Sequence, residues 1–168
     1  MRKSKEVTVR IVNEFDIKDL WIWWNDPHNL KMMYNNEPSN WENHCRWFRN
    51  TILTKKRIQY IGIYNGQKIG AVWFDHVVDN VYEVGITMNK LFRGKRLAGE
   101  VLQQSIHVFC NNYKTSLLVA SGKKINIPCN KTFLSCGFIN AIPSEKINNN
   151  RQKLDMKYYW YVEYKVNH

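Results

Sequence analysis

The chain has 168 residues, of which 44% are hydrophobic and 14% aromatic, and its 25 Lys and Arg against 14 Asp and Glu give a formal net charge of +11. This length suits a single domain over residues 1–168, and the composition excludes intrinsic disorder. No apolar stretch approaches the ~20 residues of a membrane helix, and no apolar run typical of a signal peptide follows the basic residues 1–7. We therefore expect a cytoplasmic protein that does not act at a membrane.

The cysteines and the net charge limit the possible ligands. Cys45, Cys110, Cys129 and Cys136 form no C-x-x-C pair and have no paired histidines near them, so we expect reduced thiols and no metal site. The excess of positive charge favours a polyanionic partner. Nucleic acid, phospholipid and a phosphorylated small molecule all fit, and the charge alone does not choose among them.

The first third of the sequence predicts one strand and two helices. Residues 7–12 alternate between apolar and polar side chains as in a strand, and Asp16 is a suitable N-cap for a helix that ends before Pro27. Apolar residues then recur at helical spacing over residues 41–53, after the potential caps Ser39 and Asn40.

The middle of the chain predicts an antiparallel meander. Residues 58–64 and 67–76 read as strands joined by Asn65-Gly66, which suits a tight type I′ turn. A third strand over residues 81–88 follows directly.

The remaining pattern alternates between helix and strand. We expect an amphipathic helix over 95–112, a strand over 116–120, a helix over 130–135, and strands over 138–142 and 154–166. The Asn-rich segment 145–153 is expected to be an exposed loop. The predicted order is β α α β β β α β α β β, an α+β chain.

The most informative segment is residues 88–102, in which the end of a predicted strand is followed by a basic turn and by the start of the long helix. The first N–H groups of a helix have no intrahelical partner and favour an anion such as a phosphate. Small and basic residues gather at this turn: Gly94, Ala98 and Gly99, and Arg93, Lys95 and Arg96. The alternative is an ordinary solvated turn, since such residues are common at helix starts.

Two motifs resemble the GCN5-related N-acetyltransferase (GNAT) family. Residues 93–98 are similar to the family's Arg/Gln-x-x-Gly-x-Gly/Ala loop, but Arg96 replaces the middle glycine. Residues 126–138 resemble its Asn...Tyr-x-x-x-Gly-Phe segment, with Phe133 in place of the tyrosine. The order of predicted elements is also the family's order.

The resemblance implies an α/β/α fold with a mixed, mostly antiparallel sheet of about six to seven strands, helices on both faces and a splay between strands 4 and 5. It also implies acetyl-CoA as co-substrate, with direct acetyl transfer to a primary amine. The residues implied to bind acetyl-CoA are Ile86, Thr87 and Met88 beside pantetheine, Arg93, Gly94, Lys95, Arg96, Leu97, Ala98 and Gly99 at the pyrophosphate, and Asn126, Lys131 and Phe133.

The resemblance also suggests a general base but leaves the general acid open. Glu83, on the strand before the loop, resembles the family's base, and its alternative is a solvated strand residue. Phe133 cannot donate a proton to the leaving thiolate. Ser135, Tyr158 or Tyr159 could take that role, or backbone donors and water could do so.

A finer resemblance concerns the acceptor. Residues 23–27 and 37–47 look like the W-x-N-D/H-P and H-x-x-W/F segments of acetyltransferases in nucleotide-linked amino-sugar pathways, such as the pseudaminic-acid type. By position this implies the substrate residues Asn25, Asp26, His44 and Trp47, with Asp75 and His76 as further candidates. The alternative for Asn25 and Asp26 is a helix terminus, and the alternative for His44 and Trp47 is a packed helix face.

The leading hypothesis is an N-acetyltransferase acting on a small-molecule amine, the amino group of a nucleotide sugar destined for surface glycan. A protein or peptide N-terminus or another small amine is the alternative, and the positive charge disfavours an aminoglycoside. A basic nucleic-acid-binding module and a fold that binds acetyl-CoA without turnover are the remaining hypotheses; no recognised nucleic-acid motif appears. We expect a monomer or a homodimer.

Overall fold

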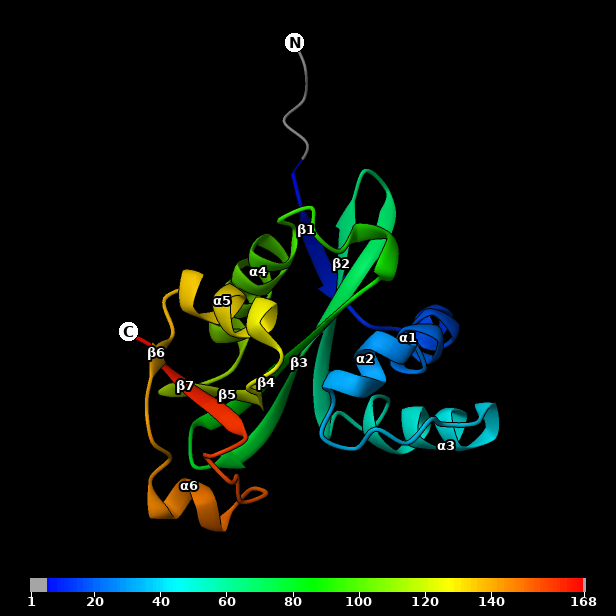
Figure 1. Ribbon diagram of the computed structural model, residues 1–168. Helices are drawn as coiled ribbons and strands as arrows, with labels where there is room; N and C mark the ends of the chain where they lie inside the picture. Colours follow the sequence, from blue (N-terminus) through cyan, green and yellow to red (C-terminus); the bar gives the residue numbers. More distant parts are fainter. Residues whose placement is uncertain (1–5, 168) are drawn as a thin grey trace.

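The computed structural model describes residues 6–167 and places helices on both faces of a seven-stranded sheet (Figure 1). The strand order is β1-β2-β3-β4-β5-β7-β6. Neighbouring strands run antiparallel except β4 and β5, which are parallel. The mixed, mostly antiparallel sheet predicted from the sequence is therefore confirmed.

The strands are β1 (Thr8–Ile11), β2 (Arg57–Tyr64), β3 (Gln67–Val78), β4 (Val81–Met88), β5 (Leu117–Lys123), β6 (Ile139–Asn140) and β7 (Tyr159–Lys165). The α-helices are α1 (Ile17–Trp24), α2 (Pro27–Met32), α3 (Trp41–Thr51), α4 (Ala98–Asn112), α5 (Ile127–Ser135) and α6 (Glu145–Asn149). Short 3₁₀ turns cover Glu14–Asp16 and Lys90–Phe92.

Two short helices were not expected. Helix α1 does end before Pro27, but Pro27 then begins α2, where its missing N–H costs nothing, and the Asp26 side chain caps this helix by accepting from the Asn29 N–H. Helix α6 lies in the segment expected to be an exposed loop, and the Ser144 hydroxyl caps it. Helices of one or two turns leave little periodicity in a sequence.

The buried polar residue Asp16 does not cap α1 with its side chain, contrary to expectation. Its carboxylate is fully buried and binds the Arg10 guanidinium (2.7 and 2.8 Å), the Lys68 ammonium (2.8 Å) and the Asn13 N–H (2.9 Å). Burial on its own would raise the pKa of Asp16, but these donors lower it to about 2. The carboxylate thus fastens β1 to β3.

The long helix α4 shows the predicted amphipathic character. Val101, Leu102, Ile106 and Phe109 are buried against the sheet in the largest cluster of the core. The helix begins at Ala98 rather than at residue 95, because Arg96 has a φ of +60°, which is incompatible with a right-handed helix.

The sheet opens between β4 and β5. The two strands pair only at Val81↔Leu117, Tyr82↔Leu118 and Glu83↔Val119. From Ala120 onward β5 pairs with β7 alone, while Val84 to Met88 pair with β3 and leave their other edge free. The predicted splay between strands 4 and 5 is confirmed, with Glu83 at its apex.

Over the described part of the chain, no helix combines the length and the apolar character needed to cross a bilayer.

Candidate active site

A cleft of about 1150 Å³ occupies the splay between β4 and β5. Its walls come from both strands, the start of α4, helix α5, the segment around α2 and the loop before β7. The cleft brings together most of the predicted site residues: Asp75, Glu83, Ile86, Thr87, Met88, Arg93, Gly94, Arg96, Leu97, Ala98, Gly99, Asn126, Lys131, Phe133 and Ser135. This volume can hold a large, elongated ligand.

The start of α4 forms one end of the cleft. Leu97 is the N-cap and makes no side-chain cap hydrogen bond, so the first N–H groups of the helix are left for another partner. Gly94 and Arg96 both have positive φ, at +73° and +60°, and bend the turn around this helix end. Lys95, expected at the pyrophosphate, does not line the cleft, and its ammonium lies 5.2 Å from the Phe92 ring centroid.

Arg93 lines the cleft but is held by a neighbouring helix. Its guanidinium donates to Asp26 (2.7 Å) and to the Met88 carbonyl (3.3 Å). Burial acts to raise the pKa of Asp26, but Arg93 and the backbone N–H groups of Asn29 and His28 together outweigh it, so that the pKa is lowered. Asp26 was predicted as a substrate residue, but it lies outside the cleft lining and fixes Arg93 to α2.

Helix α5 packs against the start of α4 and continues the wall of the cleft. The Asn126 side chain caps it by accepting from the Cys129 N–H (3.4 Å). Phe133 is 1% exposed and packs against the rings of Phe138 and Trp160, at centroid distances of 5.0 and 5.8 Å. The Ser135 hydroxyl donates to the Thr132 carbonyl (2.8 Å) and is exposed to solvent. Phe133 is therefore a packing residue that also borders the cleft.

Glu83 lies in an ion-pair network at the apex of the splay. Its carboxylate accepts from the Arg151 guanidinium and from the Ser121 hydroxyl (3.3 Å), and Arg151 also donates to that hydroxyl (2.7 Å). The Arg151 side chain is only 5% exposed. Sequence reasoning missed Arg151, because a single arginine in an Asn-rich segment carries no signal of a buried position.

Asp75 and His76 lie on opposite faces of the sheet, as successive strand residues do. Asp75 lines the cleft and accepts two hydrogen bonds from Arg57, at 2.8 and 2.7 Å. His76 lies outside the cleft, where its Nε2 is 2.8 Å from the Asp79 carbonyl oxygen and its ring meets the Tyr82 ring edge-on.

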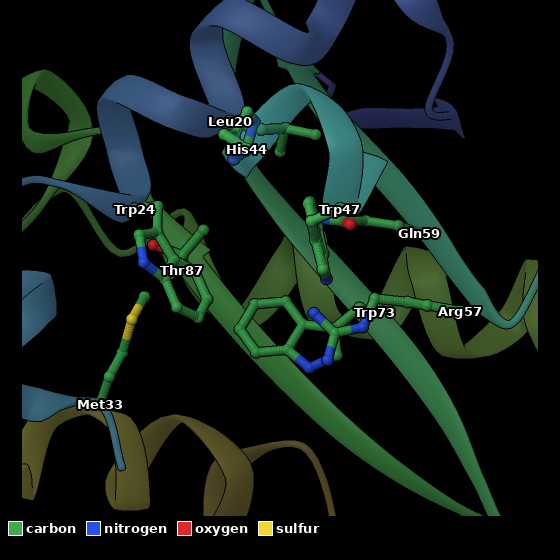
Figure 2. A pocket seen from close by; sticks show the side chains of 9 residues that line it. All are labelled: Leu20, Trp24, Met33, His44, Trp47, Arg57, Gln59, Trp73 and Thr87. Atoms are coloured by element: carbon green, nitrogen blue, oxygen red, sulfur yellow. The ribbon is translucent and has the colours of Figure 1, made fainter. Parts of the chain in front are cut away.

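A small apolar cavity adjoins the cleft beside α1 and α3 (Figure 2). It measures about 20 Å³ and is lined by Leu20, Trp24, Met33, His44, Trp47, Arg57, Gln59, Trp73 and Thr87. Five of these residues, Trp24, Met33, Arg57, Trp73 and Thr87, also line the cleft. The two spaces are therefore contiguous.

The structure places the predicted residues His44 and Trp47 at this small cavity. His44 is 4% exposed, and its Nε2 lies 2.9 Å from the Ile17 carbonyl oxygen. Burial lowers the pKa of His44, so the imidazole is neutral near pH 7 and donates its Nε2–H to that carbonyl. Asn25 lies apart from both cavities, and its side chain bonds the Ser39 backbone at both the carbonyl and the N–H, each at 2.8 Å.

Among residues 6–167, no group of three or more His, Cys, Asp or Glu side chains is arranged to hold a metal ion. Cys129 lines the cleft and is partly buried, and its burial raises the pKa of the thiol to about 12. A thiol with this pKa is protonated near neutral pH and is a poor nucleophile.

Comparisons with known proteins agree with this architecture. The model of the acetyltransferase (GNAT) domain matches residues 6–139. A search of curated protein sequences finds no match.

Three solved structures illustrate the likeness. A domain from Methanocaldococcus jannaschii DSM 2661 has a TM-score of 0.77 at 20% identity, covering 97% of this chain and 100% of that one. An aminoglycoside acetyltransferase in complex with coenzyme A has a TM-score of 0.75 at 15% identity, covering 95% of each chain. A ribosomal L7/L12 alpha-N-protein acetyltransferase in complex with coenzyme A has a TM-score of 0.76 at 11% identity, covering 98% and 96%.

Identities this low show a shared fold and leave the substrate open. The family model is the stronger finding, because it spans most of the chain and includes both β4 and the loop that opens α4. The chain belongs to the GNAT family of acetyltransferases.

Proposed function

We propose that this acetyltransferase transfers an acetyl group from acetyl-CoA directly to the primary amine of a nucleotide-linked amino sugar. The observation that carries the proposal is the splay between β4 and β5, which has an uncapped helix start at one end and a carboxylate at its apex. Membership of the family accounts for the acetyl transfer, and the acceptor is our proposal.

The described residues fit acetyl-CoA. The start of α4, together with Arg96 and Lys131 at the cleft, would hold the pyrophosphate. The free edge of β4 from Val84 to Met88 offers backbone hydrogen-bonding groups to the pantetheine amides. When bound, acetyl-CoA supplies an acetyl group activated as a thioester.

Glu83 would remove a proton from the acceptor amine. An amine reaches the site largely as an ammonium ion and needs a free lone pair to attack a carbonyl carbon. A Glu83 oxygen can accept the proton, and Arg151 and Ser121 fix the carboxylate in place. Because the Glu83 side chain is 29% exposed, the proton can then pass to solvent. Ser135 remains the candidate donor to the leaving thiolate.

The charge of the cleft supports an acceptor that carries phosphate. Within the described cleft lining, Asp75 and Glu83 are the carboxylates, and each is paired with an arginine. Lys123, Arg96 and Lys131 add positive charge, while Trp24, Trp73, Tyr34 and Tyr159 offer aromatic surfaces to a sugar or a base. Such a lining suits a nucleotide sugar better than a polycationic aminoglycoside.

The test is release of free CoA thiol from acetyl-CoA with a panel of UDP-linked amino sugars, their hydroxyl counterparts, an aminoglycoside and a peptide N-terminus. We expect turnover with an amino sugar and none with its hydroxyl counterpart. Turnover confined to the peptide or the aminoglycoside would contradict the proposed acceptor.

The role of Glu83 is tested with Glu83→Gln. Loss of the proton acceptor should lower kcat roughly 100-fold or more and flatten the acid limb of the pH–rate profile, while the Kd for acetyl-CoA stays unchanged. Glu145→Gln on the surface helix α6 is the control. A pH profile of Glu83→Gln that matches the wild type would exclude Glu83 as the base.

A further inference from the structure

The small cavity beside α1 and α3 has a buried floor and a rim that opens on the cleft. Leu20, His44 and Gln59 form the floor and are only 5%, 4% and 4% exposed. The rim consists of partly buried residues that line the cleft as well: Trp24, Met33, Arg57, Trp73 and Thr87. A substituent of a ligand in the cleft can therefore enter the small cavity past this rim.

Aromatic and aliphatic side chains make up most of the wall of the small cavity. Figure 2 shows the indole rings of Trp24, Trp47 and Trp73 around one space, with the Met33 side chain pointing toward Trp24. Leu20 closes this space from helix α1. An apolar group placed here would make close dispersion contacts with these surfaces.

The polar groups of the lining leave little for a water molecule to bind. The His44 ring, the Arg57 guanidinium and the Thr87 hydroxyl are each engaged by another group, at 2.9, 2.7 and 2.9 Å. Gln59 Oε1 is buried and has no hydrogen-bond partner among the described residues, and it presents almost no surface to an occupant. Since a buried water needs two to four polar partners, the small cavity favours an apolar occupant.

The volume of the small cavity restricts the occupant to a group of one carbon. The small cavity measures about 20 Å³, and a space of ~10–15 Å³ is enough for one water-sized group. A methyl group is of that size, whereas an ethyl group or a ring would have to displace the walls. Because the wall atoms of an empty apolar cavity lack contacts on one side, a methyl group that fills it strengthens binding.

The position of the small cavity in the sheet indicates which ligand reaches it. The floor residue Gln59 lies on β2, and β3 separates this strand from β4. Neighbouring strands are ~4.8 Å apart, so the floor lies roughly 10 Å from the free edge of β4, where we place pantetheine. The two carbons of an acetyl group do not span this distance, whereas a substituent of the acceptor can.

We propose that the small cavity is a specificity site for the acceptor, which receives one methyl group of the amine substrate. The substrate class is a primary amine whose carbon skeleton occupies the cleft and carries a methyl branch that points between α1, α3 and the sheet. This inference rests on the proposed function for the use of the site, but the preference for a methyl group requires neither turnover nor a nucleotide.

The test compares cyclohexylamine with its 2-, 3- and 4-methyl and ethyl derivatives, titrated while the indole N–H resonances are followed by NMR. At one ring position a methyl group should tighten binding about fourfold, and an ethyl group at that position should lose the gain. The resonances of Trp24, Trp47 and Trp73 should respond, with that of Trp160, which lines neither cavity, as the internal reference. Methyl derivatives that bind no more tightly than cyclohexylamine at any position would overturn the proposal.

Matched variants on helix α1 assign the preference to the small cavity. Leu20→Val removes one methylene from the floor and should shift the tightest binding from the methyl to the ethyl derivative. Ile22→Val removes one methylene from a 48% exposed residue of the same helix and should leave the preference for methyl unchanged. Thermal unfolding verifies that both variants are folded. An unchanged preference in Leu20→Val, or an equal shift in both variants, would overturn the proposal.

Two further outcomes separate this proposal from its alternatives. The ratio of the Kd values of propionyl-CoA and acetyl-CoA should be the same in Leu20→Val and the wild type, and a selective gain for propionyl-CoA would assign the small cavity to the acyl chain instead. A methyl preference without turnover of any amino sugar would support the specificity site and count against the nucleotide-sugar acceptor. Turnover of an amino sugar without a methyl preference of the probes would do the reverse.

Discussion

At the scale of single residues, Arg96 adopts a backbone conformation that favours glycine. It occupies the position where the family motif has glycine, and its φ of +60° keeps the conformation that glycine would take without strain. The substitution in the motif therefore changes the charge of the turn rather than its path.

Replacing Arg96 by glycine should stabilise the fold and weaken acetyl-CoA binding. Relief of the left-handed conformation should add about 1 kcal/mol to the free energy of unfolding. Loss of a charge at the cleft should raise the KM for acetyl-CoA about threefold to tenfold. Denaturant unfolding and steady-state kinetics measure the two effects. Lys95→Gly removes a positive charge that lies outside the cleft lining, at a residue without a positive φ, and should show neither the gain in stability nor the rise in KM.

Asp16 should make stability depend on pH in the acid range. Its pKa of about 2 in the folded protein lies below the ordinary value of 3.8, so the stabilisation is present above pH 4 and is lost as the pH falls from about 4 to 2. The expected loss is about 2 kcal/mol. Urea unfolding at a series of pH values measures it.

The controls for Asp16 are two asparagine variants. Asp16→Asn should lose about 2 kcal/mol at pH 7 and show no further Asp16-dependent fall below pH 4. Asp19→Asn removes a 39% exposed partner of Lys68 and should cost less than about 0.5 kcal/mol. Equal losses in the two variants would contradict the role of the buried carboxylate.

Among the elements, β3 and β4 meet closely where the Trp73 side chain of β3 packs against the Gly85 backbone of β4. A Cβ on Gly85 would lie 2.1 Å from Cζ2 of Trp73, so the indole rests directly on the glycine backbone. Gly85→Ala should displace this ring, cost about 1–3 kcal/mol of stability and raise the KM for the acceptor.

Thermal unfolding and kinetics on a second, doubly substituted protein check this prediction. Gly85→Ala combined with Trp73→Leu should regain stability, because the clash is removed, but not acceptor affinity. Gly99→Ala is the matched control, since its Cβ would meet no atom closer than 3.8 Å. A Gly85→Ala protein as stable as the wild type would show that the ring moves without cost.

The long elements could be predicted from the sequence because each buries a regular pattern of side chains. The Asn65-Gly66 turn predicted the β2–β3 hairpin, and the spacing of apolar residues predicted α4. Helices α2 and α6 could not be predicted with the same rules, because one or two turns depend on a single cap and on tertiary contacts. Helix α5 begins at Ile127, before the expected residue 130, because Asn126 caps it.

At the scale of the whole molecule, the candidate site joins segments that are distant in the chain. The sequence motifs located Glu83 and the turn before α4, and the structure places both at the cleft. The motifs could not reveal that Arg151 reaches Glu83 across 68 positions. Side-chain partners of this kind are decided by the packing of the sheet and loops, which one sequence pattern does not encode.

Acetyl-CoA is expected to bind in the splay with its pyrophosphate at the start of α4, and isothermal titration with acetyl-CoA measures this binding. Gly99→Leu places a side chain in the cleft where the backbone leaves space, and Gln103→Leu places the same residue on the exposed side of α4. We expect micromolar binding by the wild type and by Gln103→Leu, and binding at least about tenfold weaker by a folded Gly99→Leu protein. No binding by the wild type, or equal affinity in all three proteins, would contradict it.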